Sequence, residues 1–350
     1  MFVAESNSAV LAVASPPLPK SLSPWKQIVA PVKPFLKAVA KRLAEQVEAF
    51  DPEIAVYARY ALTNQGKQLR PALVALSAGA TGQVRDSLVT VAVIIEMIHL
   101  ATLVHDDVMD EAVIRRRRPT LAANWGNEIS VLLGDCLFAH ALKLAASFPA
   151  PDICRAVSAA TNTVCSGEIL QTNRRHNHQI TRAEYFRILE MKTAELFALS
   201  CELGTWANGA TTPERRALRG FGLALGTAYQ VYDDCVDLFG SETVVGKSLG
   251  TDLAGGKVTL PLLVAFERAG AADRADLQSV VKDWEPRAFP RVLALLEKYD
   301  ALNESRRVIW GYLESARGSL AALRESESSR GLIGLTEFLA QQTEALGVSA

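Results

Sequence analysis

Apolar residues recur at intervals of three and four positions along almost every long segment of this 350-residue chain. This spacing places them on one face of an α-helix, whereas convincing strand-like alternation is absent. The longest apolar stretch, residues 88–104, is interrupted by Glu96 and His99, which favours a buried core helix over a membrane span. The pattern therefore predicts an all-α protein, a helical bundle with a central cavity.

Capping side chains indicate where several helices should begin. Pro31 and Pro34 should divide the first helical segment before a longer helix runs to about Phe50. An amphipathic helix is also expected around Glu304–Glu325. The expected starts are Ser23-Pro24, Asp51-Pro52, Asp86, and two capping boxes at Thr181 to Glu184 and Thr212 to Glu214.

Composition favours one domain with no polyanionic partner. No Pro/Gly/Ser-rich linker follows about residue 35, so we expect a flexible leader at 1–22 and a single helical domain at 23–350. The leader has no Lys or Arg before its apolar run Ala9–Ala14, which is too short for a secretory signal; a plastid address stays open. With 37 basic and 38 acidic residues, the net charge of −1 argues against nucleic-acid binding.

The five cysteines lie scattered among apolar residues and form no CxxC pair. Their odd number and spacing predict reduced core thiols rather than disulfides. This favours a cytoplasmic protein.

Two acidic motifs are the main chemical signal. Asp106, Asp107 and Asp110 follow the long apolar stretch, and a second DDxxD motif, 233–237, follows another apolar helix. Residues four apart lie one turn apart on a helix, so the spacing predicts two carboxylate pairs, Asp106 with Asp110 and Asp233 with Asp237. Such pairs, completed by water and phosphate oxygens, suit Mg²⁺.

Solvated helix ends are the plain alternative for these motifs. With 15 Asp in the chain, about 0.03 DDxxD matches are expected by chance, so two are hard to attribute to accident. Carboxylates attached to an apolar helix also repel one another unless a cation compensates them.

Basic residues supply the complementary charge for diphosphate groups. Lys67 and Arg70 lie one turn apart in GKQLRP, and a run of four arginines, 115–118, follows the first acidic motif. Alone, such a run is as often a solvated patch. Further candidates are Lys192 with Thr193, Lys247 and Lys257.

Together these residues resemble the trans-isoprenyl (polyprenyl) diphosphate synthases, and among them the medium- and long-chain members. The resemblance covers about residues 66–263 and rests on several motifs in one order. They are GKQLRP at 66–71, EMIHLATLVHDDVMDE at 96–111, RRRRPT at 115–120, GEILQ at 167–171, KTAELF at 192–197, YQVYDDCVD at 229–237 and GKSLGTDLAGGKVTLPLL at 246–263.

The resemblance implies a role for each matching residue. Isopentenyl diphosphate would contact Lys67, Arg70, His99 and Arg116; the allylic diphosphate would contact Arg115, Lys192, Thr193, Gln230, Lys247 and Lys257. Magnesium, about three ions per site, would be held by Asp106, Asp110 and Asp233, with Asp107, Asp234 and Asp237 in support. His99 without the motif would be taken for a core histidine. A homodimer is implied as well, with no transmembrane anchor but possible peripheral membrane contact.

The implied reaction is ionisation of the allylic diphosphate, attack by the double bond of isopentenyl diphosphate, and loss of a proton. Small residues Ala101 and Thr102, about one turn before Asp106, favour an open cavity floor and a product longer than geranylgeranyl diphosphate. Ile95 and Ile98 could still close the path. Arg117 stands where the family usually has glycine, and its effect stays open.

Five alternatives remain. A head-to-head squalene or phytoene synthase is also helical and based on acidic motifs, but GKQLRP is not expected there. A farnesyl or geranylgeranyl diphosphate synthase would share every motif. A class I terpene cyclase needs no second diphosphate site, so GKQLRP and the second complete DDxxD argue against it. A non-catalytic modulatory subunit should have lost site residues, and a structural helical protein leaves the paired motifs unexplained.

Overall fold

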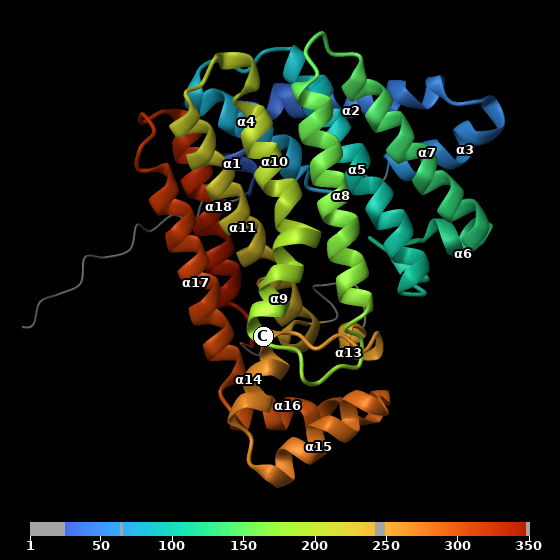
Figure 1. Ribbon diagram of the computed structural model, residues 1–350, viewed down its shortest axis with the longest axis vertical. Coiled ribbons are helices and arrows are strands. Elements are labelled where there is room, and N and C mark those ends of the chain that lie inside the picture. Colours follow the sequence, from blue (N-terminus) through green and yellow to red (C-terminus); the bar gives the residue numbers. More distant parts are fainter. Residues whose placement is uncertain (1–24, 64–65, 242–248, 348–350) are drawn as a thin grey trace, which may run out of the picture.

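The computed structural model describes residues 25–63, 66–241 and 249–347, and helices form nearly all of its regular structure (Figure 1). The all-α prediction is confirmed. The α-helices are α1 (Trp25–Ile28), α2 (Lys33–Gln46), α3 (Pro52–Thr63), α4 (Leu69–Thr81), α5 (Ser87–Met109), α6 (Leu121–Trp125), α7 (Asn127–Ala146), α8 (Asp152–Thr172), α9 (Arg182–Leu189), α10 (Glu195–Gly204), α11 (Thr212–Phe239), α13 (Thr251–Ala254), α14 (Leu260–Arg268), α15 (Ala271–Lys282), α16 (Phe289–Lys298), α17 (Ala301–Leu320) and α18 (Glu327–Glu344).

Helix α5 is the core helix that the apolar stretch predicted. It packs against α2, α4 and α7, and its side chains are buried on almost every side. Even Glu96, at 3% exposure, lies inside the protein. Burial on all sides explains why this segment lacks a polar stripe.

The structure contains both predicted capping boxes, and one of them begins one residue earlier than predicted. At the start of α9, Thr181 and Glu184 exchange hydrogen bonds between side chain and backbone, as predicted. At α11 the cap is Thr211, not Thr212, because the glutamate must stand three residues after the capping hydroxyl. Asp86 precedes α5 but its side chain makes no capping bond.

The N-terminal helices are divided as the prolines predicted. A 3-10 turn, Ala30–Val32, separates α1 from α2, and Pro34 lies in the first turn of α2. A second 3-10 turn, Val47–Ala49, carries the chain to Phe50. Ser23-Pro24 and the expected leader lie outside the described residues.

A short hairpin that the sequence did not predict follows α5. Strands β1 (Ile114–Arg115) and β2 (Arg118–Pro119) pair antiparallel, and Arg116 and Arg117 form the turn with φ of 50° and 61°. Two consecutive positive φ angles are typical of hairpin turns that prefer Asn-Gly. Glycine adopts this backbone conformation without strain, so position 117 suits glycine. Arginine there lowers the free energy of unfolding by about 1 kcal/mol.

The C-terminal half covers the core. Helix α17 packs against α11, α14 and α18, and it runs from Ala301 to Leu320 rather than over the predicted 304–325. Helices α14, α15 and α16 lie at one end of the molecule (Figure 1). They continue the helical layer without adding cavity-lining residues from α15 or α16.

All five cysteines are free thiols. Cys201 and Cys235 are buried, whereas Cys165 is exposed, so the prediction of core thiols is wrong for Cys165. Two helices, α5 and α7, are long and apolar enough to cross a membrane. The most apolar part of α5 is 67% buried and that of α7 33% buried, so α7 leaves apolar side chains at the surface.

Candidate active site

An open cavity of about 2050 Å³ lies among helices α5, α7, α8 and α11 and is bordered by the 114–119 hairpin and by α18. Acidic and basic side chains line it around Asp106 and Asp233. Apolar side chains, including Phe138, Val164 and Leu225, line other parts of the wall. One cavity therefore combines a charged region with a hydrocarbon surface.

The first acidic motif divides its three carboxylates between two surroundings. Asp106 lies in the last turn of α5 and Asp110 caps its C-terminal end, and both line the cavity, as their spacing indicated. Asp107 is buried and accepts a hydrogen bond from Nε of Arg115 at 2.6 Å. This pair forms because the hairpin brings Arg115 back toward α5.

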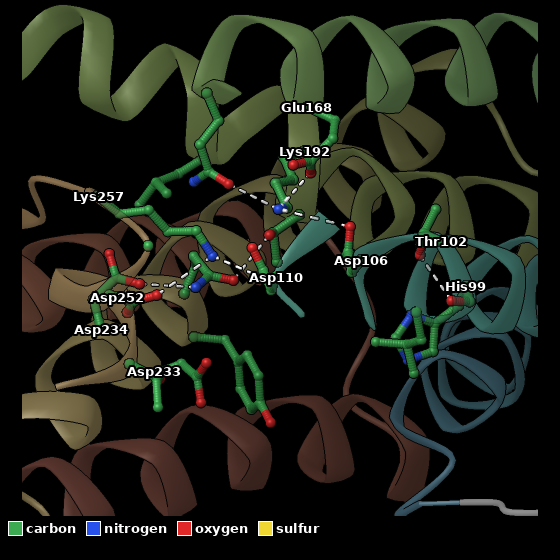
Figure 2. A pocket seen from close by; sticks show the side chains of 18 of the residues that line it. His99, Thr102, Asp106, Asp110, Glu168, Lys192, Asp233, Asp234, Asp252 and Lys257 are labelled. Carbon is green, nitrogen blue, oxygen red and sulfur yellow. Dashed lines mark hydrogen bonds and ion pairs between the residues drawn. The ribbon is translucent and has the colours of Figure 1, made fainter. Parts of the chain in front are cut away.

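Two lysines hold the cavity carboxylates (Figure 2). Lys192 Nζ forms an ion pair with Glu168, donates to Gln171 Oε1 at 2.8 Å and lies 3.9 Å from Asp106 Oδ1. Lys257 Nζ donates to Asp110 Oδ2 at 3.0 Å.

Burial and neighbouring charge shift the pKa values of these groups. Burial raises the pKa of Asp106 to about 6, against the opposing effect of Lys192. Burial alone would lower the pKa of Lys257, but Asp252 and Asp110 raise it to about 12. The lysine is therefore fully charged at neutral pH.

The second acidic motif is arranged differently. Asp233 is exposed and lines the cavity. Asp234 is buried and accepts hydrogen bonds from Tyr185 Oη at 2.5 Å and from Gln230 Nε2 at 2.9 Å. The spacing paired Asp233 with Asp237, but Asp237 does not line the cavity in this structure.

Asp237 is completely buried and accepts hydrogen bonds from the first residues of α13. Its carboxylate accepts hydrogen bonds from the Thr251 hydroxyl at 2.5 Å, the Thr251 N–H at 3.2 Å and the Asp252 N–H at 3.0 Å. These donors draw the carboxylate away from the cavity. Asp237 therefore positions the segment that carries Asp252 and Lys257.

A π-helical turn, η3 (Glu190–Ala194), lies between α9 and α10 and carries Lys192 and Thr193. Such turns widen a helix locally and are frequent at functional sites. Thr193 Oγ1 donates to Gln230 Oε1 at 2.9 Å, and Gln230 in turn donates to Asp234. The chain of hydrogen bonds fixes the wall between the two acidic motifs.

A second basic group lines the cavity beside α4. Arg70 is half-buried, its guanidinium lies 4.9 Å from the Phe197 ring centroid, and burial lowers its pKa against the opposing effect of Glu96. Lys67 Nζ lies 5.5 Å from the Phe338 ring centroid. Burial, together with Arg70 and Arg116, lowers the pKa of His99 well below its usual value, so this imidazole is neutral.

The chain matches the sequence profile of the polyprenyl synthetase family over residues 51–296. It belongs to that family. The octaprenyl diphosphate synthase of Haemophilus influenzae is 33% identical over 303 residues, which cover 86% of this chain and 92% of that protein. This chain is accordingly a prenyltransferase, a trans-polyprenyl diphosphate synthase.

Solved structures of related enzymes have the same fold. A polyprenyl synthase from Caulobacter crescentus, complexed with calcium and isoprenyl diphosphate, matches with a TM-score of 0.86 and 31% identity over 92% of this chain and 99% of that one. A geranylgeranyl pyrophosphate synthetase from Pyrococcus horikoshii matches with a TM-score of 0.84 and 28% identity over 91% and 99%. The fold is therefore shared by enzymes named for different products.

The two proposed chain-length residues of the synthase lie in different places. Thr102 lines the cavity one turn from Asp106, and its hydroxyl donates to the His99 carbonyl at 2.7 Å (Figure 2). Ala101 is completely buried and does not line the cavity. One position along a helix rotates a side chain by about 100°, so the two neighbours face different surroundings and the chain-length role of Ala101 stays a prediction. Ile95 and Ile98 are buried and do not line the cavity either.

Several cavity residues of the synthase escaped sequence reasoning. Glu168 and Gln171 lie three apart on α8 within the GEILQ motif, so a helical wheel could have found them. Tyr185 and Arg175 belong to no motif that we recognised. Lys247, assigned to the allylic substrate, lies outside the described residues.

The carboxylates of the synthase do not converge on one metal-binding position among the described residues. Within residues 25–63, 66–241 and 249–347, no three His, Cys, Asp or Glu side chains converge closely enough to hold an ion. Asp110 is instead drawn toward cations, its carboxylate meeting Lys257 and Arg175. The carboxylate oxygens of the acidic motifs nonetheless match the preference of Mg²⁺ for oxygen ligands.

Proposed function

We propose that this synthase condenses isopentenyl diphosphate with an allylic diphosphate primer and releases an all-trans product longer than geranylgeranyl diphosphate. The observation that carries the proposal is the cavity wall, where carboxylates and cations surround Asp106 and apolar side chains occur on α7 and α8. The charged region suits diphosphate groups, and the apolar region suits a growing hydrocarbon tail.

The allylic diphosphate is assigned to the region between the two acidic motifs. Lys192 and Lys257 support the assignment because both already compensate carboxylates there. Asp106, Asp110 and Asp233 would hold magnesium, which supplies positive charge that stabilises a departing diphosphate. The full set for the allylic substrate is Arg115, Lys192, Thr193, Gln230, Lys247 and Lys257.

Isopentenyl diphosphate is assigned to the basic group beside α4, formed by Lys67, Arg70, His99 and Arg116. Arg70 supports this role because its buried Nε has no hydrogen-bond partner among the described residues. A buried donor without a partner costs about 1–3 kcal/mol, which a phosphate oxygen would recover. Neutral His99 can donate a hydrogen bond without adding repulsion between the cations.

The reaction then follows from these positions. The bond between the allylic carbon and its diphosphate oxygen breaks, and the electron pair leaves with the diphosphate, whose charge Lys192 and Lys257 stabilise. The double bond of isopentenyl diphosphate attacks the allylic cation and forms the new carbon–carbon bond. The released diphosphate removes a proton to restore a double bond, so no side-chain base is assigned. Apolar walls keep water from the cation.

Product length is assigned to the apolar part of the cavity. Thr102 presents a small side chain there, and the partly buried Phe138 of α7 is a larger group that lines the same cavity. The octaprenyl relative supports a product beyond geranylgeranyl diphosphate.

A second copy of the chain is proposed to cover α7 and α8. Val131 and Leu132 on α7 are 42% and 61% exposed, and Ile169 on the adjacent α8 is 61% exposed. Burying such apolar side chains between two copies stabilises a homodimer by about 25 cal/mol per Å². Reduced thiols support a cytoplasmic location, with peripheral membrane contact through the lipid product.

Product analysis tests the proposal. Purified protein is incubated with Mg²⁺, labelled isopentenyl diphosphate and, separately, dimethylallyl, geranyl, farnesyl and geranylgeranyl diphosphates, and the dephosphorylated products are resolved by length. Products longer than geranylgeraniol, lost with chelator, are expected. Products that stop at geranylgeraniol would keep the enzyme class and overturn the length, and no elongation with any primer would overturn the activity.

A further inference from the structure

Arg175 lies opposite the first acidic motif but belongs to no motif discussed above. It stands in the connection between α8 and α9 and lines the cavity. Its Nη2 donates to Asp110 Oδ1 at 2.9 Å and its Nη1 donates to the Met109 carbonyl at 3.3 Å. A basic side chain therefore meets the end of α5 from outside the known motifs.

Asp110 is held by two cations at once. Arg175 takes Oδ1, and Lys257 takes Oδ2 at 3.0 Å. A metal ion that binds Asp110 needs at least one of these oxygens. Metal binding must therefore weaken or break one of the two contacts.

The guanidinium of Arg175 is only partly satisfied. Its Nε is buried and has no hydrogen-bond partner in the part of the chain that the structure describes. Nε and Nη2 form one edge of the guanidinium, a fork that matches two oxygens of a phosphate group. Nη2 donates a hydrogen bond to Asp110, whereas Nε has no hydrogen-bond partner among the described residues.

We propose that Arg175 is a further substrate-binding residue, which neutralises Asp110 before metal binds and turns its Nε/Nη2 edge to the allylic diphosphate afterwards. The proposal rests on the proposed function. It gives the unpartnered Nε a ligand, and it keeps the charge near Asp110 balanced in both states. The contact with the Met109 carbonyl can hold the side chain in place during the exchange.

The plain alternative is that Arg175 only braces the connection between α8 and α9. Its neighbour Arg174 offers a matched control, because it donates twice to Glu184 Oε1, at 3.0 and 3.2 Å, and thereby supports the capping box of α9. Arg174→Gln removes the same charge from the same segment without touching Asp110.

Calorimetry on full-length Arg175→Gln separates the two roles, with inorganic pyrophosphate and Mg²⁺ as probes. At saturating Mg²⁺ we expect pyrophosphate to bind about 10-fold more weakly than to the wild type. Mg²⁺ alone should bind as well or a few-fold more tightly, because a competitor for Asp110 is gone. Arg174→Gln should lower the melting temperature and leave pyrophosphate binding unchanged.

Steady-state kinetics give a second readout. Arg175→Gln should raise KM for the allylic diphosphate and leave KM for isopentenyl diphosphate unchanged, and Arg175→Lys, which keeps the charge without the fork, should fall between. If Arg175→Gln folds poorly, Arg175→Lys carries the test. Unchanged pyrophosphate binding in either variant, or equally weakened Mg²⁺ binding, would overturn the proposal. A wild-type enzyme that binds pyrophosphate but elongates no primer would overturn the proposed function instead.

Discussion

The two acidic motifs have the same DDxxD sequence but different tasks. In the first, Asp106 and Asp110 line the cavity and Asp107 turns back to Arg115. In the second, only Asp233 and the hydrogen-bonded edge of Asp234 line the cavity, and Asp237 is completely buried. The motif supplies carboxylates, and the neighbouring donors decide which of them are available to a metal ion.

The difference follows from what packs beside each helix. The first motif ends α5 at the open hairpin, where Lys192, Lys257 and Arg175 can approach from other elements. The second lies within α11, where α9 and α13 supply close donors. Buried carboxylates with several donors are structural elements as much as chemical ones.

The largest expected effect is the loss of a cavity carboxylate from the first motif. Asp106→Asn removes a negative charge that the metal needs, and we expect turnover to fall by about 10³-fold with the fold intact. Rates at saturating Mg²⁺ and circular dichroism measure this. Activity within tenfold of wild type would remove Asp106 from the metal site.

A second pair of variants contrasts the two neighbouring chain-length candidates. Thr102→Phe places a ring in the cavity and should shorten the product. Ala101→Phe places the same ring in a closed core and should cost about 1–3 kcal/mol of unfolding free energy. Product chromatography and urea unfolding distinguish them. Shortening by Ala101→Phe alone would reverse the assignment.

Sequence reasoning predicted the helical fold, the core helix and the polar residues that gather at the cavity. It failed where contacts with distant segments decide which way a side chain points. The four-residue spacing placed Asp237 beside Asp233, but the donors on Thr251 and Asp252 come from a segment that periodicity cannot place. Arg175 carried no periodic or motif signal, because the closure of the α8–α9 connection brings it to Asp110.

Tyr185 tests the structural character of the second motif. Tyr185→Phe removes the 2.5 Å donor to Asp234, and we expect a loss of about 1–3 kcal/mol in unfolding free energy with no change in product length. Tyr312→Phe is a suitable control, because its hydroxyl makes no hydrogen bond to the described residues. Equal stability of both variants would contradict a structural role for this bond.

The smallest expected effect concerns the hairpin beside the first motif. Arg117→Gly relieves a left-handed arginine at φ 61° and should raise the unfolding free energy by up to about 1 kcal/mol. Arg117→Asn, which tolerates this conformation better than arginine, should gain less. Chemical unfolding measures the unfolding free energy of both variants. A loss of stability in Arg117→Gly would contradict the expectation, because it would show that contacts of the Arg117 side chain stabilise the fold by more than its left-handed backbone destabilises it.

The difference between the two motifs is tested most directly by the Mg²⁺ dependence of turnover in Asp233→Asn and Asp237→Asn. We expect Asp233→Asn to need at least about tenfold more Mg²⁺ for half-maximal rate, with its melting temperature unchanged. Asp237→Asn should keep the wild-type Mg²⁺ requirement within about twofold and lower the melting temperature, because the NH2 group that replaces one buried carboxylate oxygen cannot accept a hydrogen bond. A raised Mg²⁺ requirement in Asp237→Asn without loss of stability would contradict the account and restore the pair that spacing predicted.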